Sequence, residues 1–235
     1  MHTTRTVQFS LDGKKMFISS GSSSNVDPET DERRAAIMVA NPDGSNHSIY
    51  ASGLRNGVGI AVNPDTGELW VSVNERDLLG DNLPPDYITH LVEGGFYGWP
   101  YSYIGQHVDE RAKPPRPDLV AKAIVPDVLL GAHVAPLQFA FYTGRQFPAP
   151  YQHGAFLAEH GSWNRSILAG YQVVFIPFRN GHASAPPTPF LTGFMTDANS
   201  RTVNGRPVGV AVAQDGSLLV SDDGGNVIWR VSKSK

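Results

Sequence analysis

Near its start the chain carries the segment Val7-Gln8-Phe9-Ser10-Leu11-Asp12-Gly13-Lys14-Lys15-Met16-Phe17-Ile18-Ser19, two β-rich runs joined by an Asp-Gly turn. An Asp-Gly pair supplies the positive φ that a tight hairpin turn needs, so the segment predicts two antiparallel strands. The same sequence pattern recurs at Ile60–Ser72 and at Val210–Ser221, and a degenerate copy lies at Gly154–His160 after Pro150–His153. The sequence therefore repeats one hairpin unit along its length.

Further strand candidates lie between these copies, at 36–40, 48–51, 171–178 and 226–231. Each unit then holds about four strands, and hairpin pairs repeated at intervals of roughly 40–75 residues are typical of a β-propeller. A sandwich of short strands is the alternative, but a sandwich would not repeat one phrase at corresponding points. We expect an all-β fold with almost no helix, a single propeller domain over residues 1–235 with about four blades. Insertions at 76–135 and 179–205 are expected to build the site on one face.

Composition excludes several other classes. The net charge is −3 and only 17% of the residues are charged, which argues against a nucleic-acid partner. A hydrophobic content of 40% argues against disorder. The absence of cysteine excludes disulfides, thiolate nucleophiles and iron–sulfur clusters. No apolar run reaches the length of about 18 residues that a membrane span needs, and no signal peptide is visible.

Polar clusters recur where the predicted strands end. In a propeller, equivalent loops meet at the central channel, so the guanidinium groups of Arg55, Arg165 and Arg206 are expected to point at one place, together with Asn56 and Asn164. Converging guanidiniums suit a ligand that carries several carboxylates. Taken singly, a loop arginine is usually solvated and a loop histidine is usually structural. Recurrence at one phase of the repeat favours a shared site.

The tryptophans at 70, 99 and 163 are interpreted as packing residues rather than stacking platforms. Other catalytic patterns are missing from the sequence: there is no Gly-x-Ser-x-Gly elbow, no Walker loop, no His-Glu-x-x-His and no βαβ unit for NAD.

At these residues the sequence resembles the glucose/sorbosone dehydrogenase family of soluble quinoprotein aldose dehydrogenases, and its sorbosone-dehydrogenase-like branch in particular. The motifs that carry the resemblance extend over nearly the whole chain. They are His2–Arg5, Leu54–Asn56, Gly67–Asp77, Gly94–Pro100, His133–Pro136, Glu159–Arg165 and Gly205–Ala211. The resemblance implies a six-bladed propeller that holds pyrroloquinoline quinone (PQQ) and Ca²⁺ on its top face and oxidises the anomeric carbon of a sugar.

The resemblance also implies roles for single residues. His2 matches the general base that takes the hydroxyl proton of the sugar, while hydride passes to C5 of PQQ with help from calcium. The cofactor-binding positions are Arg55, Asn56, His133, Asn164, Arg165 and Arg206. The segment Glu75-Arg76 falls where the family offers two backbone carbonyls to Ca²⁺. A second arginine of the glucose-dehydrogenase branch is replaced here by Val208.

The family implies a sugar substrate, a quinone or cytochrome as electron acceptor, and a periplasmic or secreted location. The His2 motif lies well inside family members, so about two N-terminal blades are expected to be absent. Two outcomes are expected: the four blades close on themselves, or they form an open arc whose exposed sheet edges lead it to dimerise or aggregate. Dehydrogenation is expected to be impaired in either case. Two alternatives remain open: a calcium-dependent lactonase with a cage of Asn74, Glu75 and Asp222, or a non-catalytic propeller that binds a protein or glycan.

Overall fold

The computed structural model describes residues 2–199 and 201–233, and its framework is four antiparallel sheets that follow one another along the chain. The first sheet contains β1 (Val7–Phe9), β2 (Met16–Ser20), β3 (Ala36–Ala40) and β4 (Ser48–Ser52), extended by β8 (Gly95–Phe96), and the second contains β5 (Gly57–Val62), β6 (Leu69–Val73), β7 (Pro85–His90) and β11 (Val128–Ala132). The third sheet contains β12 (Pro136–Phe141), β13 (Gly154–Glu159), β14 (Gln172–Arg179), β15 (His182–Ala183) and β16 (Thr188–Leu191). The fourth sheet contains β19 (Pro207–Val212), β20 (Leu218–Asp222) and β21 (Val227–Val231). Among the strands that the structure describes, only the short pairing of β4 with β8 is parallel.

Smaller elements decorate the connections. Two-stranded ribbons are formed by β9 (Ser102–Tyr103) with β10 (His107–Val108) and by β17 (Met195–Asp197) with β18 (Thr202–Val203). Helical structure in the described residues is limited to α1 (Pro117–Val120) and a single 3-10 turn, η1 (Ala149–Tyr151). The expectation of an all-β chain with almost no helix is confirmed.

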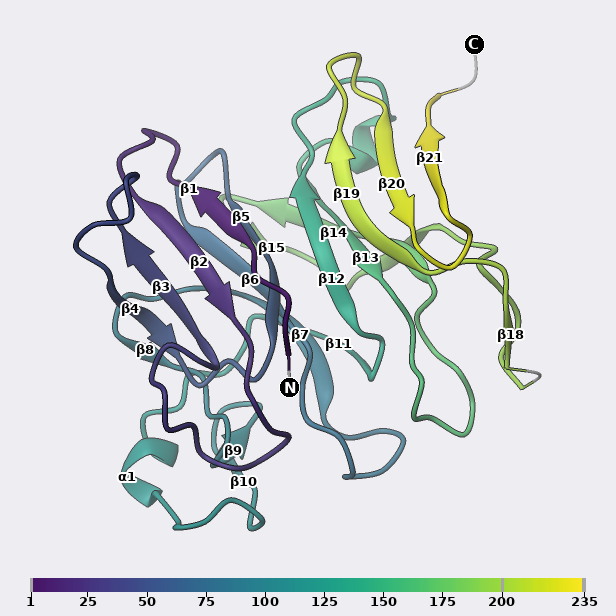
Figure 1. The fold of residues 1–235 in the computed structure, drawn as a ribbon. Coiled ribbons are helices and arrows are strands. Elements are labelled where there is room, and N and C mark those ends of the chain that lie inside the picture. Colours follow the sequence, from purple (N-terminus) through teal and green to yellow (C-terminus); the bar gives the residue numbers. More distant parts are fainter. Residues whose placement is uncertain (1, 200, 234–235) are drawn as a thin grey trace.

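The four sheets stand side by side in chain order, from the purple β1–β4 to the yellow β19–β21 (Figure 1). Strands β1, β5, β12 and β19 are the first strands of the four sheets, and β12 packs against both β5 and β19. Three apolar clusters fill the spaces between successive sheets, so each interior sheet is covered on both faces. This arrangement is propeller-like, as expected from the repeat. The number of blades in a closed ring stays a prediction.

Strand β13 shows how the sequence produces this packing. All six of its residues are buried. Successive side chains of a strand point to opposite faces. Ala155 and Leu157 therefore enter the cluster shared with the second sheet, whereas Phe156 and Ala158 enter the cluster shared with the fourth. A continuous apolar run follows from burial on both faces, and it replaces the alternation that a one-sided strand would show.

The predicted hairpins at 7–19, 60–72 and 210–221 are confirmed, since β1 pairs with β2, β5 with β6 and β19 with β20. The prediction of a hairpin at the degenerate copy was wrong in one respect. Residues 149–151 form the 3-10 turn, and β13 pairs instead with β12 across a longer connection. The segment 76–135, expected as a loop insertion, also contributes β7 and β11 to the second sheet.

Candidate functional site

A cavity of about 510 Å³ lies at the end of the sheets where the first strands begin and the second strands end. This volume falls within the range of small-molecule sites. All four sheets contribute to its wall through the loops at that end. The lining residues are His2, Ser24, Asn25, Arg55, Asn56, Asn74, Glu75, Asp77, Asp86, His133, Ala135, Leu137, His160, Gly161, Trp163, Asn164 and Arg206.

The structure brings most of the predicted site residues to this cavity. Seven line it: His2, Arg55, Asn56, Glu75, His133, Asn164 and Arg206. Of the three arginines expected to converge, Arg165 does not line the cavity, and neither does Arg76. The expectation that equivalent loops meet at one cavity is therefore confirmed for most of the repeat, and the side chains of Arg76 and Arg165 are the exceptions.

Both exceptions have a local cause. The Arg165 guanidinium donates to the carbonyl oxygens of Asp81, Ala132 and Ile167, and these bonds hold it away from the cavity.

The Arg76 side chain is fully buried elsewhere. It donates to Glu75 Oε2 at 2.9 Å, to Asp109 Oδ2 at 3.2 Å and to the carbonyl oxygens of Pro100 and Ser102. Despite its burial, Asp109 has its pKa held at about 2 by hydrogen bonds from Arg111 and by the charge of Arg76. Arg76 thus fastens the insertion at 99–111 to the end of β6.

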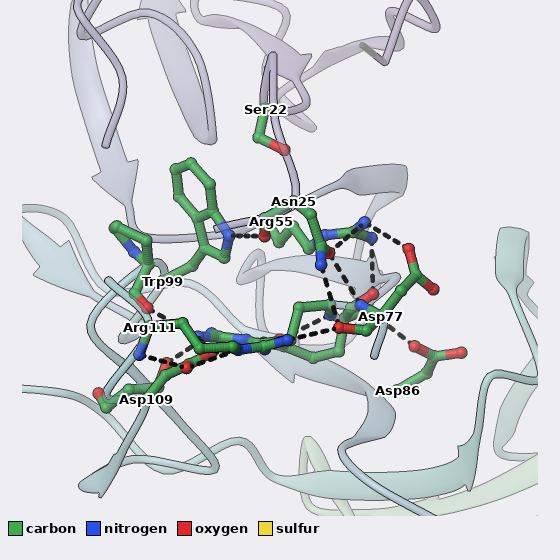
Figure 2. A network of polar contacts seen from close by, with 12 residues as sticks. Ser22, Asn25, Arg55, Asp77, Asp86, Trp99, Asp109 and Arg111 are labelled. Carbon is green, nitrogen blue, oxygen red and sulfur yellow. Dashed lines mark hydrogen bonds and ion pairs between the residues drawn. The ribbon is translucent and has the colours of Figure 1, made fainter. Parts of the chain in front are cut away.

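The Arg55 guanidinium is buried on the cavity wall and is oriented by three acceptors. It donates to the Glu75 carbonyl at 2.6 Å, to Asn25 Oδ1 at 2.9 Å and to Asp77 Oδ2 at 2.8 Å. Figure 2 shows Asn25, Arg55 and Asp77 turned toward one another, with Asp109 and Arg111 beside them. Because Asn25 belongs to the first sheet's loop and Asp77 follows β6, this cluster joins two sheets at the site.

Asp86 joins the second and third sheets in the same region. Its Oδ1 accepts from the Glu75 N–H at 2.7 Å, and its Oδ2 accepts from the Ala135 N–H at 2.8 Å. Burial raises the pKa of Asp86 to about 8, although both of these backbone bonds favour the ionised form. The carboxyl group therefore ties together the two loops that carry Glu75 and His133.

His2 lines the cavity, and its Nε2 makes no hydrogen bond to any residue that the structure describes. Its Nδ1 lies 3.0 Å from the Ser22 carbonyl oxygen, which can only accept, so Nδ1 carries the proton in the neutral ring and Nε2 keeps its lone pair. Burial, followed by the positive charge of Arg55, lowers the pKa of His2 to about 4. The imidazole is consequently neutral at pH 7 and able to accept a proton.

His133 is held in a different way. Its Nε2 lies 3.0 Å from the Gly80 carbonyl oxygen and therefore donates to it, which leaves Nδ1 as an acceptor in the neutral ring. The Asn164 amide donates to Asp77 Oδ1 at 2.8 Å and lies 3.4 Å from His133 Nδ1. Asp77 thereby connects Asn164 to Arg55 across the cavity.

Arg206 approaches from the fourth sheet. Its Nε and Nη2 donate to the carbonyl oxygens of His160 and Gly161 at 3.2 and 2.9 Å, and its guanidinium lies 5.5 Å from the centre of the Tyr171 ring. Its Nη1 makes no hydrogen bond within residues 2–199 and 201–233. Burial lowers the pKa of the adjacent His160, whose Nε2 is 2.9 Å from Asp223 Oδ1.

Four buried polar atoms on the cavity wall have no hydrogen-bond partner in the described part of the chain. They are Arg55 Nε, Asn56 Oδ1, Glu75 Oε1 and Asn164 Oδ1. A buried polar group without a partner is costly, so such a group on a cavity wall indicates a ligand. One cationic donor beside three oxygen acceptors fits an anionic ligand accompanied by a hard cation.

Sequence reasoning missed several residues of the wall. Asp77, Asp86 and Trp163 were not selected as site residues, and neither was His160, although Asp77, His160 and Trp163 stood inside the quoted motifs. Asp86 gave no local signal, because it lies within strand β7 in a segment interpreted as a loop.

The residues of the lactonase alternative are only partly brought together, since Asn74 and Glu75 line the cavity. Asp222 does not line the cavity, because its carboxylate accepts from the Arg206 and Gly225 N–H groups and from Trp229 Nε1. Residues 2–199 and 201–233 contain no group of three histidine, aspartate or glutamate side chains placed to hold a metal. No helix in this part of the chain is long and apolar enough to cross a membrane.

Fold and site together define a propeller-like protein with a polar cavity of small-molecule size at one end of its sheets. The sequence profile described as Glucose / Sorbosone dehydrogenase matches residues 1–159, and a TrAA12-like profile matches residues 118–234. The chain therefore belongs to the glucose/sorbosone dehydrogenase family, as the motifs indicated.

Curated relatives are longer than this chain. An uncharacterised protein of Borreliella burgdorferi is 36% identical over 237 residues, which span all of this chain and 62% of that protein. The pyrroloquinoline quinone-dependent pyranose dehydrogenase of Coprinopsis cinerea is 26% identical over 294 residues, which span 99% of this chain and 40% of the enzyme.

Solved structures share the fold. An AA12 enzyme of Trichoderma reesei superposes with a TM-score of 0.86 at 23% identity, covering 100% of this chain and 69% of that one. The holo PQQ domain of the Coprinopsis cinerea pyranose dehydrogenase superposes with a TM-score of 0.83 at 24% identity, covering 99% and 70%. The relationship extends over the four sheets as a whole.

Proposed function

We propose that the chain is the PQQ-binding part of a sugar dehydrogenase. The observation that carries the proposal is the convergence of His2, Arg55, Asn56, Asn164 and Arg206 from different sheets on one cavity. The named Coprinopsis relative, a pyrroloquinoline quinone-dependent pyranose dehydrogenase, supports the same cofactor and substrate class.

The cavity wall suits the three carboxylates of PQQ. Arg206 Nη1 and the buried Arg55 Nε have no acceptor among the described residues, so both can donate to carboxylate oxygens. Bound there, PQQ would supply a two-electron oxidant able to accept hydride from the anomeric carbon of the sugar. The Arg55 and Arg206 guanidinium groups would orient the cofactor. Asp77 and Asn25 hold the first in place, and the His160 carbonyl holds the second.

His2 acts as the general base in this proposal. Its Nε2 accepts the proton of the anomeric hydroxyl while its Nδ1–H stays bonded to the Ser22 carbonyl. The charged imidazolium that results keeps that bond, so the ring need not turn during proton transfer. The low pKa of His2 keeps the base unprotonated before the substrate arrives.

Calcium would be held by oxygen atoms at the end of β6. We propose that the backbone carbonyls of Glu75 and Arg76 are its protein ligands, the Glu75 oxygen using the lone pair that the Arg55 hydrogen bond leaves free. Glu75 Oε1 and Asn56 Oδ1, which have no partner among the described residues, would supply negative potential nearby. Arg76 serves here through its main chain, because its side chain anchors the 99–111 insertion. His133 and Asn164 complete the cofactor wall, and Arg165 supports it through the 81–82 loop.

We further propose that the substrate is a sugar, that the electron acceptor is a quinone or cytochrome, and that the protein is periplasmic or secreted, as the family resemblance suggests.

The experiment adds PQQ and Ca²⁺ to purified protein and records the absorption of bound quinone. A panel of D-glucose, D-galactose, D-mannose and D-xylose with an artificial electron acceptor then measures turnover. The proposal expects turnover that requires PQQ, and His2→Gln should keep the quinone spectrum while losing turnover. The exposed Arg116→Ala is the matched control. Failure of the wild-type chain to bind PQQ would refute the proposal.

A further inference from the structure

Trp163 differs from Trp70 and Trp99 in the exposure of its side chain. Trp70 and Trp99 are 0% and 2% exposed, and the Trp99 indole donates to the Asn25 carbonyl. Trp163 is 66% exposed and lines the cavity. The expectation of a packing role is therefore confirmed for the first two and wrong for Trp163.

The chain on both sides of Trp163 is firmly held. Ser162 is buried, and its Oγ accepts from the Ala169 N–H at 3.0 Å. On the other side, the Asn164 amide donates to Asp77 at 2.8 Å. Arg201 donates to the carbonyl oxygens of Trp163 and Arg165, each at 2.8 Å. The main chain of Trp163 is thus fixed although its indole is uncovered.

A fixed loop that leaves a large ring in water has a physical consequence. Burying an aromatic side chain removes roughly 150–250 Å² from water, and this chain forgoes most of that gain at Trp163. Because the loop is held by hydrogen bonds, a ligand that covers the indole pays little for ordering it. The indole is therefore suited to bind a flat apolar surface.

We propose that Trp163 is the stacking platform for the pyranose ring of the sugar; the inference rests on the proposed function. The C–H groups on one face of a pyranose form a flat apolar surface that matches an indole. Depth favours the sugar over the cofactor as the partner of this indole. Arg55, Glu75 and Asp86 are 6%, 3% and 2% exposed, whereas Trp163 on the same cavity wall is 66% exposed, so we assign the cofactor to the buried groups and the sugar to the indole.

The test measures sugar and PQQ affinities separately by calorimetry. In Trp163→Ala the dissociation constant of the best aldose of the panel should rise about tenfold, and in Trp163→Phe about threefold, because the smaller ring keeps part of the contact. PQQ affinity should stay unchanged in both variants. Ile167→Ala is the matched control, since Ile167 is 54% exposed on the same loop and does not line the cavity.

Two results would overturn the proposal. An unchanged sugar affinity in Trp163→Ala would mean that the indole faces another partner, such as the electron-acceptor protein. A tenfold loss of PQQ affinity would place the indole on the cofactor instead. A wild-type chain that binds sugar without binding PQQ would refute the proposed function while leaving the Trp163 comparison measurable.

Discussion

The Asp77 carboxylate lies 2.8 Å from the Arg55 guanidinium, and this ion pair joins the loop after β6 to the loop before β5. The second oxygen of Asp77 accepts from Asn164, which follows β13 in the third sheet. One carboxylate thereby sets the positions of two side chains proposed to bind the cofactor. Asp77 is best described as a positioning residue.

Replacing Asp77 with alanine should leave the buried Arg55 charge without its partner. Hydrogen bonds to charged groups contribute about 1.5–3 kcal/mol each, so unfolding free energy should fall by roughly 2–3 kcal/mol. Urea denaturation measures this change. Glu110→Ala, which alters an exposed carboxylate in the neighbouring insertion, should have little effect. Equal stability of the two variants would show that the Asp77–Arg55 pair contributes nothing.

The pH dependence of turnover should report His2. Its pKa is lowered to about 4, so the neutral base is present above that value and is lost as pH falls through it. The rate should therefore show no inflection between pH 6 and 7 from this group and should decline toward pH 4. His2→Gln should lower kcat by roughly 10²–10⁴-fold, the usual contribution of a general base. An inflection near pH 6.5 that disappears in His2→Gln would contradict this assignment of the ring environment.

Glu159 should make stability depend on pH. Burial raises its pKa to about 7, with Gln172 Nε2 as its hydrogen-bond donor. Between the unfolded pKa of 4.5 and the folded pKa of about 7, the folded state holds a proton that the unfolded chain has released. The free energy of unfolding therefore falls as pH rises through this window. Glu159→Gln should therefore stabilise the fold at pH 8 by about 3 kcal/mol relative to its effect at pH 4. Urea unfolding at both pH values, with Glu110→Gln as control, tests this; an equal effect at the two values would refute it.

The sequence predicted the sheets well where turn chemistry was explicit. The turns after Leu11 and after Gln214 carry an Asp-Gly pair, and the strands on both sides formed as expected. Prediction failed at β7 and β11, because the whole of 76–135 was interpreted as a loop insertion, although β11 is the apolar run Val128–Ala132. Strand β7 depends on pairing with β6 and β11 on pairing with β7, and local sequence does not report such tertiary pairings.

The site was predicted through phase in the repeat, which places the main chain but not the side-chain direction. Arg165 occupies the expected loop, yet the carbonyl oxygens of Asp81 and Ala132 draw its guanidinium aside. Asp86 shows the opposite failure, since it lines the cavity although the repeat did not point to it. It reaches the cavity from a strand, where its role depends on two N–H groups supplied by distant loops.

The central claim is that the arginines on the cavity wall bind the carboxylates of PQQ, and equilibrium titration of the chain with PQQ in the presence of Ca²⁺ tests it most directly. Arg206→Ala and Arg55→Ala should each weaken binding by roughly 1.5–3 kcal/mol, which is about 10–150-fold in dissociation constant. Arg116→Ala, an exposed arginine paired with Asp118, should bind as the wild type does. Wild-type PQQ affinity in both Arg206→Ala and Arg55→Ala would contradict the account.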